Sequence, residues 1–254
     1  MVFGSKSIVS AAALLFVASG ASASVSDVCF QVRATAEIDG VQQTATFQAL
    51  YDDMYYDEAS QTWGWDLQSP LELRSSEGVV IATLNEGSVR VIQDPVVSVN
   101  FAVSSGAVMT AFDITAAQLS FASLASATGY ATAAFTANDN NFDGGVTVSP
   151  LGAFPNNALY VATYNNVINP LDGTNFGGGL LINGPYSNPF ITGDSGTVPL
   201  QAIPGTVSNM QAGFQFSLSS GDQASGTSTF EIVPAPGTLA LLGLGGLFAS
   251  RRRR

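Results

Sequence analysis

The sequence contains no histidine and one cysteine, and Lys6 is its one lysine. Without histidine the chain cannot form a serine or cysteine protease triad, and it lacks an ordinary ligand of zinc sites. Lys6 lies in an N-terminal segment that we expect to be removed, so a Ser-Lys dyad is excluded as well. Cys29 has no partner for an internal disulfide, so we expect a fold stabilised by core burial, with Cys29 as a small buried hydrophobe. Pairing of Cys29 with another chain is the alternative.

Basic residues are scarce throughout the body of the chain, residues 24–232. Three arginines, Arg33, Arg74 and Arg90, against nineteen aspartates and glutamates give this body a formal charge of −16. Phosphate backbones bind clusters of lysine and arginine, so the composition argues against a nucleic-acid partner. An anionic polysaccharide would also be repelled unless a cation bridged it to the protein.

The first 23 residues have the pattern of a secretory signal peptide. A lysine precedes an apolar stretch over residues 8–17, and Ala21-Ser22-Ala23 supplies the small-x-small pattern found before a cleavage point. We therefore expect cleavage between Ala23 and Ser24, which makes Ser24 the first residue of the mature protein.

The last 22 residues form a second signal, built from a proline-bounded motif, a short apolar run and a basic end. As a helix, residues 238–250 would span roughly 20 Å at about 1.5 Å per residue, less than the roughly 30 Å of a bilayer's hydrocarbon core. This pattern predicts a short transmembrane helix that is a poor permanent anchor. Arginines resist translocation, so the positive-inside rule keeps the end of the chain in the cytoplasm and the body outside. The motif consists of Val233, Pro234, Ala235, Pro236 and Gly237, and the basic cluster of Arg251, Arg252, Arg253 and Arg254.

The order Val-Pro-x-Pro-Gly, a leucine- and glycine-rich helix and a terminal arginine cluster resembles the PEP-CTERM sorting signal. Ala235 stands where that signal usually has glutamate. The resemblance implies recognition by an exosortase, a membrane-embedded cysteine protease or transpeptidase, while the precursor is held in the bacterial inner membrane. It also implies association with exopolysaccharide, biofilm or floc matrix, and a final site at the cell surface or in the extracellular matrix. An ordinary tail anchor is the alternative.

The body shows the period of two that is typical of half-buried strands. Val97, Val99, Phe101 and Val103 alternate with small or polar residues, and residues 214–218 repeat the pattern. Many short segments of this kind predict one all-β domain, an antiparallel β-sandwich or jelly roll, with the segment 97–103 as a central strand. Further strands are expected at 28–37, 42–50, 79–84, 111–115, 131–136, 159–164, 180–182 and 227–233.

Turn residues separate these segments. Turns are expected at 39–40, 85–87, 104–106, 183–185 and 193–194, where Gly, Asn, Asp and Ser cluster. The best helical signal, residues 115–125, has room for one or two turns. The stretch 150–204 is rich in Asn, Gly and Pro, which predicts long loops or a second sheet layer.

One acidic loop matches the first half of a calcium-binding loop. Asp139, Asn141, Asp143 and Gly144 follow an order in which oxygen donors at alternate positions converge on the cation. Pro150 occupies the twelfth position in place of the bidentate glutamate, so an EF-hand is excluded. A looser calcium loop is one interpretation, and a turn whose side chains bond their own backbone is the favoured one. We therefore expect no cofactor beyond weakly bound calcium.

Both tryptophans of the chain lie in residues 50–66, where aromatic and acidic residues are interleaved. Aromatic faces beside carboxylates are suited to stacking on sugar rings and accepting hydrogens from their hydroxyls. If residues 56–65 form a hairpin, Trp63 and Trp65 share one face of a strand. Core packing of that face is the favoured interpretation, and glycan contact is the alternative. The candidate glycan-binding residues are Tyr55, Tyr56, Trp63 and Trp65.

These observations predict an exported structural or interaction protein of the envelope or extracellular matrix, without catalytic activity. A glycan-binding module is the first alternative, and exposure of the tyrosine- and tryptophan-rich segment distinguishes it. A glycoside hydrolase is the second alternative, because the many acidic residues allow a pair of carboxylates in one cleft. The expected partners are an exosortase-like enzyme, the inner membrane during sorting and polysaccharide.

Overall fold

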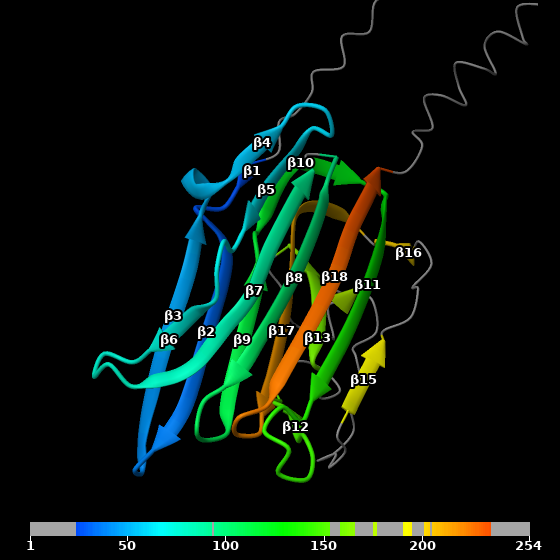
Figure 1. Ribbon diagram of the computed structural model, residues 1–254. Coiled ribbons are helices and arrows are strands. Elements are labelled where there is room, and N and C mark those ends of the chain that lie inside the picture. Colours follow the sequence, from blue (N-terminus) through cyan, green and yellow to red (C-terminus); the bar gives the residue numbers. More distant parts are fainter. Residues whose placement is uncertain are drawn as a thin grey trace, which may run out of the picture.

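The computed structural model describes residues 24–92, 94–152, 158–165, 175–176, 190–194, 201–203 and 205–234 (Figure 1). This part of the chain is mostly β-strand, joined by turns and by one short 3-10 helix at Tyr51–Asp53. The expected all-β fold is confirmed. The signal peptide, tail residues 235–254, and the strand and turn expected at 180–185 lie outside the described residues.

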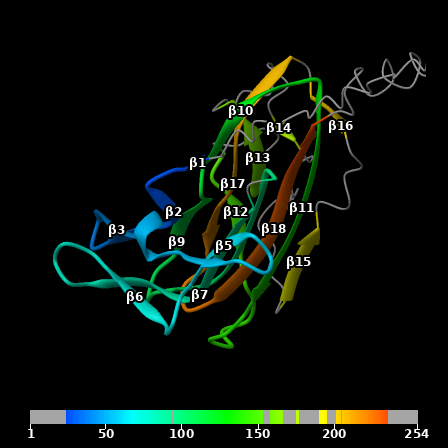
Figure 2. The same ribbon diagram turned by 90° about the horizontal axis from the view of Figure 1, so that it is seen from above.

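The strands form two antiparallel sheets that pack face to face as a β-sandwich (Figures 1 and 2). The first sheet has the order β1-β10-β17-β9-β2-β3, and both β12 and β13 pair with β17 as well. Its strands are β1 (Ser24–Val25), β2 (Val28–Ile38), β3 (Val41–Leu50), β9 (Thr110–Ala116), β10 (Leu119–Ala125), β12 (Val148–Pro150), β13 (Tyr160–Tyr164), β14 (Asn175–Phe176) and β17 (Thr206–Leu218).

The second sheet has the order β15-β11-β18-β8-β7-β5-β4, with β16 beside β11 and β6 beside β7. Residues 97–103 lie in β8, between β18 and β7, so their expected central position is confirmed. The strands are β4 (Tyr55–Asp57), β5 (Thr62–Asp66), β6 (Leu71–Arg74), β7 (Val80–Ile92), β8 (Val96–Ser105), β11 (Ala127–Asn138), β15 (Phe190–Asp194), β16 (Gln201–Ala202) and β18 (Gln223–Pro234).

The core is built from apolar side chains that alternate strand positions direct between the two sheets. Phe216 on β17 lies at its centre, with its ring centroid 6.1 Å from that of Phe101, 5.4 Å from Phe112 and 4.9 Å from Phe135. All four rings are fully or almost fully buried, and they come from both sheets. Gly226 on β18 makes room for them, because a Cβ there would lie 2.5 Å from Phe101 Cε1. Interleaved rings of this kind join the sheets into one domain.

Cys29 on β2 belongs to the same core. Its side chain is fully buried, and the thiol donates a hydrogen bond to the Ala49 carbonyl, with Sγ 3.3 Å from the oxygen. Burial raises the pKa of this thiol to about 11. Because the thiolate is the reactive form, Cys29 is an unreactive packing residue, as the sequence predicted.

The turn expected at residues 85–87 was wrong, and packing explains why. β7 runs through these residues with a β-bulge between Leu84 and Glu86. Gly87 lies against the core, since a Cβ there would be 3.2 Å from both Phe30 and Trp65. The glycine therefore serves a close ring contact rather than a change of chain direction.

Two other local expectations were wrong and one was confirmed. The helix expected within 115–125 is replaced by β10, whose Leu119 is buried and whose hydrogen bonds join β1 to β17. Residues 193–194 end β15 instead of forming a turn. The turn at Asp39-Gly40 is present, and both residues have positive φ, +53° and +75°, as a tight two-residue hairpin requires.

Replacing Phe216 with alanine should destabilise the domain strongly, because it empties the centre of the ring cluster. We expect a loss of about 3–5 kcal/mol. This corresponds to a fall of roughly 6–20 °C in Tm for a domain of this size, measured by circular dichroism. Phe142→Ala is the matched control, since Phe142 is 89% exposed and should change Tm little. Equal effects of the two substitutions would contradict the assigned core.

Candidate functional site

The aromatic and acidic segment forms the hairpin β4–β5, as the sequence predicted. Tyr55 pairs with Gly64 and Tyr56 with Trp63, so neighbouring tyrosines point to opposite sides of the hairpin. Trp63 and Trp65 lie two residues apart on one side, and Tyr55 lies on the other. The structure therefore divides the four candidate glycan-binding residues between two surfaces.

Asp57 stabilises the turn of this hairpin. Its carboxylate accepts hydrogen bonds from the Ala59 amide at 3.0 Å and from the Ser60 hydroxyl at 2.7 Å. These bonds, the one from Ser60 above all, lower the pKa of Asp57 and favour its charged form. The carboxylate is thus a fixed negative group at the tip of the sheet.

Trp65 is a core residue. It is 8% exposed, and its ring lies 5.2 Å from Phe30 and 5.7 Å from Phe47, measured between centroids. Both partners belong to β2 and β3 of the opposite sheet. A ring in this position packs the two sheets together and offers little surface to a ligand.

Trp63 lies in a smaller aromatic cluster at the end of the sandwich. Its ring centroid is 5.0 Å from Tyr51 and 4.9 Å from Tyr56, and both contacts are tilted. Trp63 is half-buried, whereas Tyr56 is 45% exposed. These contacts cover much of the Trp63 ring, whereas Tyr56 remains partly exposed to solvent.

Tyr55 is fixed on the outward side of the hairpin by charged neighbours. Its hydroxyl donates to Asp66 Oδ2 at 2.9 Å, and Arg90 donates to Asp66 Oδ1 at 2.7 Å. The Arg90 guanidinium carbon lies 5.7 Å from the centre of the Tyr55 ring. The hydrogen bond to Asp66 raises the pKa of Tyr55, so the phenol remains a neutral donor at physiological pH. Tyr55 is 49% exposed and presents a positioned ring to solvent.

This outward side carries a hollow of about 320 Å³, which we call the hairpin hollow. Its volume is at the lower end of the roughly 300–1,000 Å³ usual for small-molecule sites. Asp57 is the one carboxylate in its lining, whereas glycoside hydrolysis uses two. The lining consists of Tyr55, Asp57, Ser60, Thr62, Arg90 and Ile92.

Arg90 is the part of this site that sequence reasoning missed. Arg90 comes from β7 and reaches the hairpin only through the pairing of β5 with β7. It also donates to the Trp65 carbonyl at 3.0 Å, which ties the two strands together. The sequence feature that could have drawn attention to Arg90 is that it is one of three arginines in an acidic body.

The acidic loop brings the candidate calcium ligands together, and they bond one another. Asn141 Nδ2 donates to Asp143 Oδ2 at 3.0 Å, and the Asp143 amide donates to Asn141 Oδ1 at 3.0 Å. The Gly144 amide donates to Asp139 Oδ2 at 3.2 Å. These are the bonds of a turn that pairs with its own backbone, although Asp139 Oδ1 is buried without a hydrogen-bond partner. Within the described ranges, no group of three or more His, Cys, Asp or Glu side chains is arranged to hold a metal ion. Calcium binding stays a prediction.

Asp222 lies beneath this loop and was not singled out from the sequence. It is fully buried in the turn between β17 and β18, 82 positions after Asn140 in the chain. Its carboxylate accepts hydrogen bonds from the Asn140 amide at 3.2 Å and from the Ser219 hydroxyl. Burial raises the pKa of Asp222, the two hydrogen bonds lower it, and the charges of Asp139 and Asp143 raise it further. The net direction is upward, so ionisation of Asp222 is disfavoured by the fold.

Comparison with known proteins assigns the tail. Residues 233–254 match the family model of the PEP-CTERM protein-sorting motif. The comparison with curated proteins gives no match. Among solved structures, the chain is similar to a carbohydrate-binding module of the β-sandwich superfamily, with 11% identity and a TM-score of 0.21 over 78% of this chain and 83% of that one. So low a TM-score carries no argument about binding.

The fold and the tail together define an exported β-sandwich protein that is anchored transiently in the membrane before sorting. Its C-terminal 22 residues are a PEP-CTERM sorting signal, which implies processing by an exosortase. In the part of the chain that the structure describes, no helix is long and apolar enough to cross a bilayer.

Calcium should stabilise the domain only slightly. A weak extracellular-type site, with Kd about 1 mM, would contribute about 1 kcal/mol at about 5 mM calcium, or roughly 2–4 °C in Tm. Asp143→Ala should remove this shift, whereas Asp39→Ala, in a distant turn, should not. A shift well above about 10 °C that Asp143→Ala abolishes would show a much stronger site than the loop geometry indicates.

Asp222→Asn should stabilise the domain at neutral pH. The folded-state pKa of Asp222 is raised, so its contribution to stability is fully present below the unfolded pKa, about 3.9, and is lost as the pH rises through the folded value. Asparagine cannot ionise and keeps that contribution at every pH. We expect Tm to rise at pH 7 and the gain to vanish near pH 3, where Asp222 is protonated in both the folded and the unfolded state. A gain that is equal at both pH values would contradict the titration of Asp222.

Proposed function

We propose that this protein is a structural or interaction component of the bacterial cell surface or extracellular matrix, which an exosortase-like enzyme releases or attaches after export. The observation that carries the proposal is the position of the sorting motif, residues 233–254, directly after the sandwich. We further propose that the mature protein acts by binding polysaccharide and catalyses no reaction.

The geometry of the last strand is compatible with removal of the tail after the domain has folded. β18 contains the first two residues of the motif: Pro234 pairs with Ala127, and Thr128 donates to the Val233 carbonyl at 3.4 Å. Phe230 and Ile232, just upstream, are buried in the core. Cleavage within residues 233–236 would remove the tail and leave every core residue of β18 in the mature domain.

The surface charge favours a neutral polysaccharide as the matrix partner. The body carries three arginines against nineteen acidic residues, and Arg74 and Arg90 are already paired with Glu72 and Asp66. Few positive charges are left to attract an anionic polymer. Ser, Thr, Asn and Gln make up much of the outer faces, and these side chains both donate and accept hydrogen bonds with sugar hydroxyls.

Replacing Arg251–Arg254 with serine tests the sorting step. Without the basic cluster, the tail should slip outward, escape processing and remain on most of the exported chain. Immunoblots of membrane, envelope and culture fractions measure the processed share. Arg33→Ser, an exposed arginine of the body, is the control and should process normally. Unchanged processing of the tail variant would contradict the proposed route.

We place the proposed polysaccharide binding at the hairpin hollow, and one observation favours this site. The Tyr55 ring is about half exposed and is held by Asp66 and Arg90, so it is organised before any ligand arrives. A sugar ring stacked on Tyr55 would have Asp57, Ser60 and Thr62 within the same hollow as hydrogen-bonding groups.

Tyr55→Ala should weaken binding to neutral polysaccharide at least about tenfold, since aromatic anchors often contribute more than about 1 kcal/mol. Depletion assays with cellulose, chitin and the exopolysaccharide of the producing strain measure the affinity. Tyr56→Ala is the matched control, because Tyr56 is similarly exposed but faces the other side of the hairpin. Loss of binding in the control with retention in Tyr55→Ala would place the site on the Trp63 side instead.

A further inference from the structure

A second hollow lies on the opposite side of the sandwich, on the outer face of the first sheet. There β9, β17 and β13 run side by side, and their outward residues fall into register. Thr115 pairs with Gly213, which pairs with Val161. Two residues further along β17, Gln215 pairs with Asp113. Gly213 has no side chain, so the row of paired residues Thr115, Gly213 and Val161 is open at its centre. The neighbouring side chains surround this opening.

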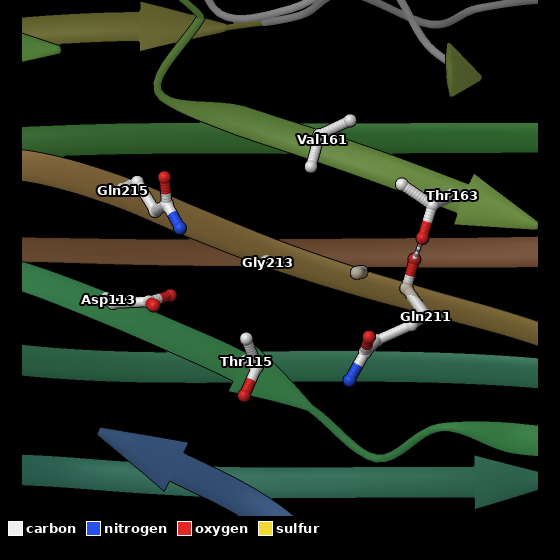
Figure 3. Close-up of a pocket in the computed structure, with 8 residues that line it drawn as sticks. Asp113, Thr115, Val161, Thr163, Gln211, Gly213 and Gln215 are labelled. Atoms are coloured by element: carbon white, nitrogen blue, oxygen red, sulfur yellow. Dashed lines mark hydrogen bonds between the residues drawn. The ribbon is translucent and has the colours of Figure 1, made fainter. Parts of the chain in front are cut away.

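The result is a hollow of about 160 Å³ over Gly213, which we call the sheet hollow (Figure 3). In Figure 3, polar side chains from three strands surround the glycine, and Val161 adds an apolar edge. The volume is well below the roughly 300–1,000 Å³ of sites that enclose a whole small molecule. A hollow of this size fits one unit of a larger ligand. It is lined mainly by Asp113, Thr115, Val161, Thr163, Gln211 and Gln215.

Two oxygen atoms of this lining have no hydrogen-bond partner within the protein. Asp113 Oδ1 and Gln215 Oε1 are both shielded from solvent and unpaired. Two other polar groups of the lining are paired: Gln211 Nε2 donates to the Ala116 carbonyl at 3.1 Å, and the Thr163 hydroxyl donates to the Gln211 carbonyl at 3.4 Å. Buried acceptors without a donor are unfavourable, and they are rare in folded proteins.

Arg33 is the nearest candidate to supply that donor, since it pairs with Asp113 across β2 and β9. The ion pairs among the described residues are Arg74–Glu72 and Arg90–Asp66, so Arg33 does not satisfy the Asp113 carboxylate. Arg33 is exposed. The two acceptors therefore stand adjacent on neighbouring strands, with a hollow in front of them.

We propose that the sheet hollow binds one unit of a neutral polyhydroxylated ligand, a sugar residue within a polysaccharide chain. Asp113 Oδ1 and Gln215 Oε1 accept hydrogen bonds from two hydroxyls of the sugar, and the Thr115 hydroxyl adds a donor or acceptor. Val161 packs against the apolar face of the ring. This inference rests on the proposed polysaccharide binding and names a second site for it.

Other ligand classes fit this lining less well. A calcium ion takes six to eight oxygen ligands and several carboxylates, whereas Asp113 is the one carboxylate here. An anionic sugar would meet the charge of Asp113 at short range. A single carboxylate also leaves the site without the pair that glycoside hydrolysis needs, so the ligand is held and not cleaved.

The two hollows lie on opposite outer faces of the sandwich. Thr115 and Gln215 point away from the core on the first sheet, and Tyr55 and Arg90 point away from it on the second. A molecule that holds a sugar unit on each face joins two polysaccharide chains, because one chain cannot occupy both sites without crossing the domain edge. Such bridging is what a structural matrix component requires.

Nuclear magnetic resonance titration of the full-length chain tests the sheet hollow directly. The probes are methyl glucoside, methyl galactoside and N-acetylglucosamine at millimolar concentrations, followed by short neutral oligosaccharides. We expect at least one sugar to shift the backbone amides of Gly213, Thr115 and Gln215. Gln215→Ala and Asp113→Ala should each weaken that binding at least about tenfold, since each removes a side-chain oxygen that would accept a hydrogen bond from the ligand. Thr35→Ala, on the same face outside the hollow, should bind normally.

Three results would overturn the proposal. Shifts confined to Tyr55 and Arg90 would show sugar binding at the hairpin hollow and refute binding at the sheet hollow. Shifts confined to Gly213 and its neighbours would support the sheet hollow and refute the hairpin hollow. Shifts at Gly213 with calcium and with none of the sugars would make the hollow a cation site. Unchanged spectra with all probes, together with lower Tm in Gln215→Ala, would show that the two acceptors serve the fold alone.

Discussion

The structure depends on the ring cluster that joins the two sheets. The chain has a single, buried cysteine, so no disulfide within it holds the sandwich together. Phe101 and Phe135 of one sheet interleave with Phe112 and Phe216 of the other, and Gly226 gives them room. Because side chains alternate along a strand, committing one side of each strand to these rings frees the other side for polar residues.

That division produces both candidate binding surfaces. On the second sheet, Tyr55 and Arg90 occupy outward positions next to inward Trp65 and Val91. On the first sheet, Asp113 and Gln215 point outward from β9 and β17, and the inward residues of these two strands belong to the core. The protein thus has a largely apolar interior and two polar outer faces that point in opposite directions. The proposed matrix role uses both faces, and the sorting motif begins at Val233, at the end of the last strand.

Period-two alternation was enough to predict the fold class and the longest strands, since residues 97–103 read as a strand from their own sequence. It failed where packing decides: Gly87 was mistaken for a turn residue, although Phe30 and Trp65 close over it. The sheet hollow could not be predicted, because register alone brings Asp113 beside Gln215. Gly213 within a strand pattern was the available signal, since a glycine there often marks close approach of another group. Tyr55 was predicted as a candidate sugar-binding residue. The sequence could not show that Arg90 helps to fix it through Asp66, because that contact depends on strand pairing.

The central claim is that a complete sandwich is delivered outside the cell and is cleaved from its tail at the end of β18, within residues 233–236. Intact mass spectrometry of the protein from culture and envelope fractions tests it most directly, because one spectrum fixes both ends of the chain. The account predicts a species that begins at Ser24 and ends within residues 233–236, with or without an attached group. Mature protein that still carries residues 247–254 in the membrane would contradict it. So would an end upstream of Ile232, which would remove core residues of the last strand.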